Sequence, residues 1–414
     1  MKNKQYTYRH TNFCCYRGYI TQAIVNNLSP LLFTIFHDSY NISYEMLGQL
    51  VLINFITQIL ADIWATKYAD KYGYRKCIVI AHGFCFTGLA LLGILPILLP
   101  NSYIGLILAV MTYAIGGGII EVIISPIVEA LPNDNKEGSM SLLHSFYCWG
   151  QMAVVIISTL SLRILGRNLW PLLPLIWSLF PLYNMFIFRK VPIIPLVTDG
   201  NNMRLKELLS YRVIWLAMLL MICAGASELT MSQWSSTFAE KGLNVPKVYG
   251  DLLGPGLFAL LMAIGRTLYG FFSDKLPLRI SLIGSSILCV VAYLVTIFSS
   301  NPIVSLLFCS LCGLSVSLMW PGVFSLSSTT FPRGGTLMFG ILAIFGDIGC
   351  SLGPWMAGKV SDLILQSGRG LSLWVSQGLN LEQIGLRTGL LTGTIFPTIM
   401  LLGLLLFKQS KKND

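Results

Sequence analysis

The sequence TKYADKYGYRK at residues 66–76 lies where one long apolar run ends and the next begins. It combines a turn at Gly73 with a cluster of charges around Asp70. Roughly 200 residues later, GFFSDKLPLR at residues 270–279 places a similar charged turn around Asp274 between two further apolar runs. Because a pattern that recurs at half of the chain length marks an internal repeat, we predict two similar halves.

The composition predicts a membrane protein. Of the 414 residues, 54% are hydrophobic and 11% are charged, and the mean hydropathy is +0.70, whereas soluble domains carry about 25% charged residues. Apolar runs of roughly 18 to 28 residues follow one another, and each is long enough to cross about 30 Å of hydrocarbon as a helix. We therefore predict an all-α integral membrane protein with twelve transmembrane helices, at residues 13–36, 44–66, 76–99, 103–131, 139–165, 169–188, 211–238, 248–273, 278–299, 303–331, 335–366 and 384–407.

A polar segment at residues 189–212 divides these helices into two sets of six. We predict an N-terminal six-helix bundle at 1–188, a cytoplasmic linker at 189–212 with a short surface helix near 204–209, and a C-terminal bundle at 213–414. About 19 of the 28 Lys and Arg residues lie on the side of the two termini, and basic flanks stay in the cytoplasm. Both termini are therefore expected to be cytoplasmic.

The ten cysteines and the net charge of +10 do not require a disulfide framework or a nucleic-acid partner. All ten cysteines lie in or beside apolar segments, which indicates small core residues. We interpret the spacing of Cys309 and Cys312 as coincidental, and we predict no metal site. The positive charge follows from the basic cytoplasmic flanks, so no nucleic-acid partner is expected.

Carboxylates inside the predicted spans are functional candidates, because an acid there is costly unless it is paired, protonated or hydrated. Glu121, in GGGIIEVIISP, lies near the middle of the fourth span. Apolar surroundings favour the neutral form of an acid, so Glu121 is a candidate proton carrier, with a structural hydrogen bond as the alternative. Asp347, in IFGDIGCSLGPW of the eleventh span, is either a second titrating or cation-binding group or the partner of a buried cation such as Arg266.

A third intramembrane acid, Glu228, lies in ASELTMSQWSS of the seventh span with Ser232 and Ser235 on one helical face and Trp234 adjoining. Carboxylates accept hydrogen bonds from hydroxyl groups, and an aromatic ring packs against C–H groups. The combination predicts binding of a polyol, and Glu228 is also a candidate for proton coupling. The alternative is that Glu228 lies near the end of its span and is only hydrated.

The fifth span carries a polar stripe in SLLHSFYCWGQ. His144, Tyr147 and Gln151 follow one another at helical spacing and therefore lie on one face. Of the four histidines, His144 is the one that we place deep in an apolar run with polar companions. We predict solute contacts here, with a satisfied structural histidine as the alternative.

Amide and aromatic side chains complete the predicted solute contacts. Gln22, Asn26 and Asn27 lie together in the first span. Amides suit neutral hydroxylated solutes, but they also bond one membrane helix to another. Trp320, within SLMWPGVF of the tenth span, lines the cavity or packs between helices.

The charged turns resemble the signature loop of the major facilitator superfamily, G-x-x-x-D-[RK]-x-G-x-[RK]-[RK]. In the first copy Thr66 replaces the first glycine, and in the second Pro277 stands where the loop glycine would be. The resemblance implies two six-helix bundles that work by alternating access. We predict a cytoplasmic gate formed by the charged residues Asp70, Lys71, Arg75, Arg266, Asp274 and Lys275.

Within that superfamily the chain is most similar to the fucose and glucose/galactose permease branch. The supporting stretches include residues 116–126, LLHSFYCWGQ in the fifth span and WPGVFSL in the tenth. The resemblance implies import of a sugar with a proton, and the fourth-span glutamate of the branch maps onto Glu121. The branch also has an aspartate in the first span, where this chain has only amides such as Gln22, and Asp347 occupies a position usually taken by glycine.

These features predict a secondary active transporter that imports a small polar solute, a sugar or related neutral compound, without any cofactor. The proton is the expected coupling ion and Na⁺ the alternative. The other functions that we consider are a proton-driven exporter of amphipathic compounds and a non-transporting receptor. We predict that the chain is not an enzyme, because its intramembrane acids and histidines are spread singly over several spans. We expect a monomer in the lipid bilayer of a bacterial cytoplasmic (inner) membrane.

Overall fold

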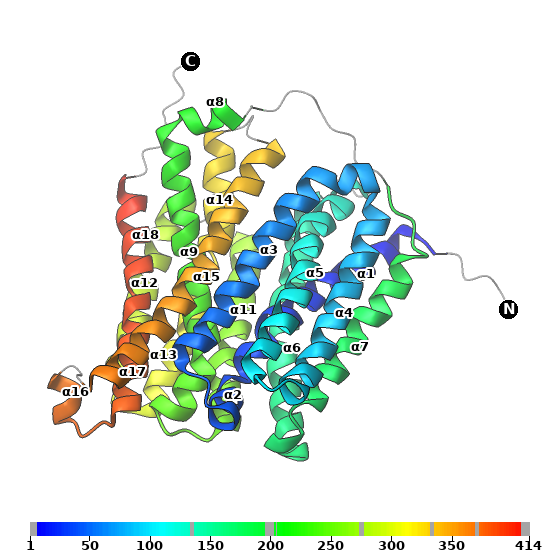
Figure 1. The fold of residues 1–414 in the computed structure, drawn as a ribbon. Helices are drawn as coiled ribbons and strands as arrows, with labels where there is room; N and C mark the ends of the chain where they lie inside the picture. The colour runs from blue at the N-terminus through cyan, green and yellow to red at the C-terminus, as the bar shows by residue number, and fades with distance from the viewer. Residues whose placement is uncertain are drawn as a thin grey trace. The chain divides into compact units, whose positions relative to one another are not determined.

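The computed structural model describes residues 6–132, 136–194, 203, 205–272, 277–331, 335–368 and 372–406. The regular structure in these ranges is helical, as Figure 1 shows. Ten of the described helical segments are long and apolar enough to cross a membrane, and α7 (Leu172–Phe188) is a shorter apolar helix. The prediction of an all-α membrane protein is therefore confirmed.

The chain divides into two compact units. The first unit joins Met1–Ile42 to Ile53–Val197, and the second joins Ser43–Leu52 to Thr198–Asp414. The first unit contains α1 (Tyr8–Leu31), α2 (Phe33–Tyr40), most of α3 (Tyr44–Tyr72), α4 (Tyr74–Leu98), α5 (Ser102–Ala130), α6 (Lys136–Leu165), the short turn η1 (Arg167–Leu169) and α7.

After the start of α3, the second unit continues with α8 (Leu205–Ser210), which matches the short helix predicted near residues 204–209. Its remaining elements are α9 (Arg212–Thr237), η2 (Phe238–Gly242), α10 (Lys247–Asp251), η3 (Leu252–Gly256), α11 (Leu257–Phe272), α12 (Leu278–Phe298), α13 (Pro302–Val316), α14 (Met319–Thr330), α15 (Gly335–Ser367), α16 (Ser372–Ser376), α17 (Leu381–Gly393) and α18 (Ile395–Leu406).

Several of the predicted spans are interrupted near prolines. Pro30 precedes the break at Leu32 between α1 and α2, Pro255 lies within the π-helical turn η3, and α13 and α14 separate just before Pro321. Proline removes a backbone donor and its ring crowds the preceding turn, so the helical hydrogen-bond ladder changes at these places. Hydrophobic run length does not reveal such breaks.

Glycines allow α9 and α15 to approach closely within the second unit. A Cβ atom added at Gly349 would lie 2.0 Å from the carbonyl oxygen of Ile222, and one at Gly225 would lie 2.2 Å from that of Gly346. Small residues are the usual means of bringing membrane helices together. This contact explains why glycines flank Asp347 in the sequence.

All ten cysteines are buried and free of disulfides. They come from helices of both units and lie among apolar side chains of the core. The prediction that they are small core residues is confirmed.

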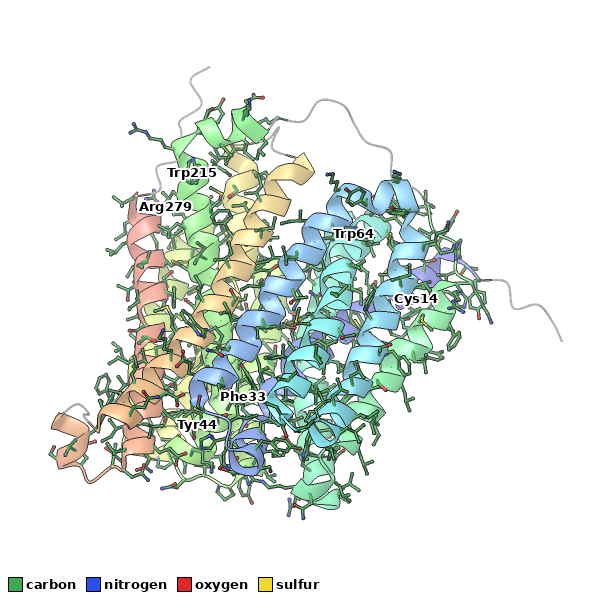
Figure 2. The ribbon with its side chains drawn as sticks, in the orientation of Figure 1. Cys14, Phe33, Tyr44, Trp64, Trp215 and Arg279 are labelled. Atoms are coloured by element: carbon green, nitrogen blue, oxygen red, sulfur yellow. The ribbon has the colours of Figure 1, made fainter. Side chains whose placement is uncertain are left out.

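The first turn of α3 is held by α15 and α17, within the second unit. The backbone N–H groups of Tyr44 and Glu45 donate to the two carboxylate oxygens of Asp362, at 3.1 and 2.6 Å. The hydroxyl of Tyr44, labelled in Figure 2, donates to Oε1 of Glu382 at 2.6 Å. Asp362 is 5% exposed, so a buried carboxylate satisfies backbone donors that a helix start otherwise leaves open.

Candidate transport site

A buried polar cluster joins α1 to α5 inside the first unit. Gln22 donates its side-chain N–H to Oε2 of Glu121. Gln22 is 4% exposed and Glu121 is partly exposed. The structure therefore brings together the first-span amide and the fourth-span acid that the sequence indicated separately.

The amide Asn26 extends the same cluster to α3. Its Oδ1 accepts hydrogen bonds from Nδ2 of Asn54 at 3.1 Å and from Nε2 of Gln58 at 2.8 Å. All three side chains are buried. Because one acceptor receives two donors, the orientations of both α3 amides are fixed.

Asp62 is a member of this cluster that the sequence analysis missed. It lies one helical turn beyond Gln58 on α3, it is 6% exposed, and a carboxylate oxygen of Asp62 lies within 4.8 Å of one of Glu121. An ideal Cβ at Gly118 would lie only 2.6 Å from Oδ1 of Asp62, so the bare backbone of α5 makes room for the acid. The spacing Asn54, Gln58, Asp62 was the available signal, since residues four apart share a helical face.

The polar stripe of α6 lies against α1. Asn27 donates its Nδ2–H to the hydroxyl of Tyr147 at 3.4 Å and to the carbonyl oxygen of Ala23 at 2.9 Å. Gln151 is 2% exposed. His144 is exposed and meets the ring of Tyr19 edge-on, with centroids 4.9 Å apart.

The deeply buried histidine is His82 rather than His144, which corrects the sequence interpretation. His82 is 0% exposed, and its Nδ1–H donates to the carbonyl oxygen of Ile78 at 2.8 Å. Its Nε2 accepts from Nδ2 of Asn184 at 2.9 Å, and Asn184 Oδ1 accepts from Nε of Arg17 at 3.1 Å. The partner Asn184 comes from α7, more than 100 residues away, so the sequence around His82 gives no indication of it.

Glu228 and Arg266 form an ion pair between α9 and α11 in the second unit. Nη2 of Arg266 lies 3.4 Å from Oε2 of Glu228, and the side chains are 20% and 10% exposed respectively. Nε of Arg266 also donates to the carbonyl oxygen of Ser317 at 3.4 Å. Arg266, assigned from sequence to the gate, is thus bound to the acid that we assigned to solute binding and proton coupling.

Trp234 packs in the core, which differs from its predicted role beside a solute. Its ring is 1% exposed and its Nε1–H donates to the carbonyl oxygen of Pro354 at 2.9 Å. Tyr44 meets the ring edge-on at 5.9 Å. With its indole N–H bonded and its ring buried, Trp234 fixes α9 to α15.

Trp320 and Asp347 are neighbours on adjoining helices of the second unit. The ring of Trp320 on α14 lies over Gly346, where an added Cβ would be 2.2 Å from Cη2. Asp347 follows Gly346 on α15 and is 3% exposed, whereas Trp320 is partly exposed. Because its ring is partly exposed, Trp320 is a better candidate for a solute contact than the buried Trp234.

The repeated charged turns perform the same local task in both units. Nη1 of Arg75 donates to the carbonyl oxygens of Phe188 and Arg189, at 2.9 and 3.0 Å, at the end of α7. Arg279, labelled in Figure 2, donates to Leu404 at 3.1 and 3.2 Å and to Leu405 at 3.1 Å, at the end of α18. A cation at a helix C-terminus satisfies open carbonyls and complements the helix dipole.

Of the other predicted gate residues, Lys71 is exposed. Asp274 and Lys275 lie outside the described residues, as does the side chain of Asp70.

Long apolar helices that bury amides and acids are expected of a membrane protein with a functional site among its spans. The Major Facilitator Superfamily model matches residues 18–354 of the 414. The chain therefore belongs to the Major Facilitator Superfamily and is an integral multi-pass transporter rather than an enzyme. Transporters of this family bind small-molecule substrates in the membrane.

Solved structures of transporters share the fold at low sequence identity. A D-xylose–proton symporter is 16% identical with a TM-score of 0.75, and 97% of each chain is covered. A bacterial homologue of the human lysosomal transporter Spinster is 14% identical with a TM-score of 0.73, covering 96% of each chain. A point mutant of the nucleoside transporter NupG is 14% identical with a TM-score of 0.73, covering 97% of this chain and 99% of the other. A comparison with curated protein sequences finds no significant match.

Proposed function

We propose that this transporter imports a small polar solute, a sugar or related neutral compound, by alternating access coupled to protons. The observation that carries the proposal is the pair formed by Glu121 and Gln22, an acid held by an amide within apolar helices. An acid in such a place changes charge when it gains or loses a proton, and that change biases a transporter between its states.

Amide-rich surroundings support a neutral, hydroxylated solute. Gln22, Asn26 and Asn27 on α1, with Tyr147 on α6, offer both donors and acceptors without net charge. In the second unit, Trp320 supplies a partly exposed ring. The likeness of the LLHSFYCWGQ and WPGVFSL stretches to the fucose and glucose/galactose permease branch, and the sugar and nucleoside carriers among the structural neighbours, favour the same class.

The arrangement of the protein in the cell is part of this proposal. Both termini and the linker face the cytoplasm, since most basic residues lie on their side of the predicted helices. The charged turns form the cytoplasmic gate. The protein works as a monomer in a bacterial cytoplasmic membrane.

Uptake by proteoliposomes tests the function. We expect a sugar from a panel of labelled xylose, fucose, hexoses and a nucleoside to accumulate when the outside is made acidic. Glu121→Gln should reduce this accumulation at least tenfold while solute exchange without a proton gradient persists. Thr112→Val, a change at a partly exposed position of the same helix α5, is the matched control and should accumulate solute as the unmodified protein does.

Two outcomes would contradict the proposal. Accumulation by Glu121→Gln at the level of the Thr112→Val control would remove Glu121 as the proton carrier. No accumulation of any sugar or nucleoside of the panel would overturn the solute class.

A further inference from the structure

Three oxygen-bearing side chains lie along one face of α3 in the first unit. Asn54, Gln58 and Asp62 are spaced four residues apart and are 5%, 0% and 6% exposed. The two amides donate their N–H groups to Oδ1 of Asn26. Each amide oxygen is therefore turned away from Asn26, in a direction that the hydrogen bond fixes.

In the part of the chain that the structure describes, the amide oxygens of Asn54 and Gln58 lack a protein donor. Among the described residues, Oδ1 of Asn54 and Oε1 of Gln58 are buried without a hydrogen-bond partner. A buried acceptor without a donor raises the free energy of the folded state. The two oxygens therefore point to a ligand that accepts a lone pair from oxygen. A cation is such a ligand.

The oxygens of Gln58 and Asp62 face the same glycine surface of α5. Oε1 of Gln58 lies 3.5 Å from the position that a Cβ of Gly117 would occupy, and Oδ1 of Asp62 lies 2.6 Å from that of Gly118. Any larger residue at Gly118 would displace the Asp62 carboxylate. Glu121, one turn further along α5, brings a carboxylate oxygen within 4.8 Å of one of Asp62.

The chemistry of these ligands selects the ion. All of them are oxygens, which hard cations prefer to the nitrogen and sulfur ligands of zinc or copper. Mg²⁺ requires near-ideal octahedral geometry and keeps several of its waters, whereas Ca²⁺ accepts irregular sets of protein oxygens at about 2.3–2.6 Å, so an ion of the size of Ca²⁺ fits these side chains better. Na⁺ is close to Ca²⁺ in size.

Charge favours the monovalent ion of that size. The free-energy cost of taking an ion out of water grows with the charge of the ion, and this site is buried among apolar helices. Na⁺ therefore enters the site at a lower cost than Ca²⁺ does.

We propose that Gln58, Asp62 and Glu121 form a Na⁺ site in the first unit, with Asn54 as the next oxygen along α3. The sequence alone indicated no metal site, because it did not place Asp62 beside Glu121. The site includes the residue assigned to proton coupling, so its role in transport rests on the proposed function, whereas Na⁺ binding does not. Na⁺ is then a second coupling ion of the same transporter.

Thermal unfolding of the purified protein in detergent tests the site. Intrinsic tryptophan fluorescence is followed while NaCl replaces KCl or choline chloride at constant ionic strength. An ion that binds only the folded state stabilises it in proportion to the logarithm of its concentration. We expect the melting temperature to rise with Na⁺ and to stay unchanged between K⁺ and choline, with calorimetric titration giving the Na⁺ affinity.

Variants separate an ion site from a structural cluster. Asp62→Asn and Gln58→Leu should each weaken Na⁺ binding at least tenfold, while Thr57→Val, the neighbouring residue whose hydroxyl donates to Ile53, should keep it. Gln58→Leu removes an oxygen without a donor and one of the two donors to Oδ1 of Asn26, which keeps the donor from Asn54. The variant is therefore expected to fold even if Asp62→Asn does not. Equal melting temperatures in Na⁺, K⁺ and choline, or unchanged Na⁺ affinity in Gln58→Leu, would overturn the site.

The two proposals fail in different ways. Proton-driven sugar uptake with no Na⁺ response would overturn the Na⁺ site and leave the proposed function standing. A Na⁺ response that is lost in Gln58→Leu, together with no uptake of any solute in the panel, would support the site and overturn the proposed function.

Discussion

Removing the carboxylate of Asp362 should free the first turn of α3. Asp362 accepts two backbone N–H groups, from Tyr44 and Glu45, while it is 5% exposed. Hydrogen bonds to a charged group contribute about 1.5–3 kcal/mol each. Water replaces part of what is lost, so we expect Asp362→Ala to cost about 3 kcal/mol of local stability, which corresponds to roughly 100-fold more frequent opening of this turn.

Hydrogen–deuterium exchange measures this opening directly. Peptides that cover residues 43–52 should exchange roughly 100-fold faster in Asp362→Ala, while peptides from α12 and α13 keep their rates. Asp362→Asn retains one acceptor oxygen and should give an intermediate increase, roughly tenfold. Ser361→Ala is the matched control, since the Ser361 hydroxyl donates to Ala357 within its own helix at 2.8 Å. If residues 43–52 exchanged at the same rate in Asp362→Ala and Ser361→Ala, the carboxylate would not be what holds α3.

Thermal unfolding of variants tests two further contacts of the second unit. Glu228→Gln or Arg266→Gln alone should lower stability by about 2–3 kcal/mol, somewhat less than for fully buried pairs because the side chains are 10% and 20% exposed. The double variant should recover part of the loss, and strictly additive losses would argue against an energetic pair. Gly349→Ala should destabilise the protein by about 1–3 kcal/mol, because its Cβ would lie 2.0 Å from the Ile222 carbonyl oxygen. Gly340→Ala on the same helix is the matched control, since its Cβ would meet no atom of the described residues within 4 Å. Equal melting temperatures for the two glycine variants would refute the close contact.

The membrane fold was predictable because it depends on composition along the chain. Long apolar runs report which segments cross the membrane without reference to their partners, and the linker helix α8 was predicted from a polar interval of the same kind. The helix breaks at Leu32 and before Pro321 were not predictable, because a proline in an apolar run is compatible with either a kinked helix or a broken one. Which of the two occurs depends on packing.

Site residues were predictable only where their own segment was unusual. Glu121 stood out as an acid within an apolar run. Asp62 did not, because it comes just before a stretch rich in charges and is easily taken for part of it. Trp234 was misassigned for a different reason: the carbonyl that accepts its N–H belongs to Pro354, 120 residues away.

The two arginine contacts bear on how such a chain assembles and on its ancestry. Arg75 reaches a carbonyl 113 residues further along, and Arg279 reaches one 125 residues further along. Each therefore forms only after the last helix of its own half has been inserted, and each fastens that helix to an early one. Each half therefore contains both partners of its own arginine contact, so a cut in the polypeptide at the linker leaves both contacts intact. For the same reason, the duplication of one half, followed by end-to-end joining of the two copies, would give a chain in which both contacts form.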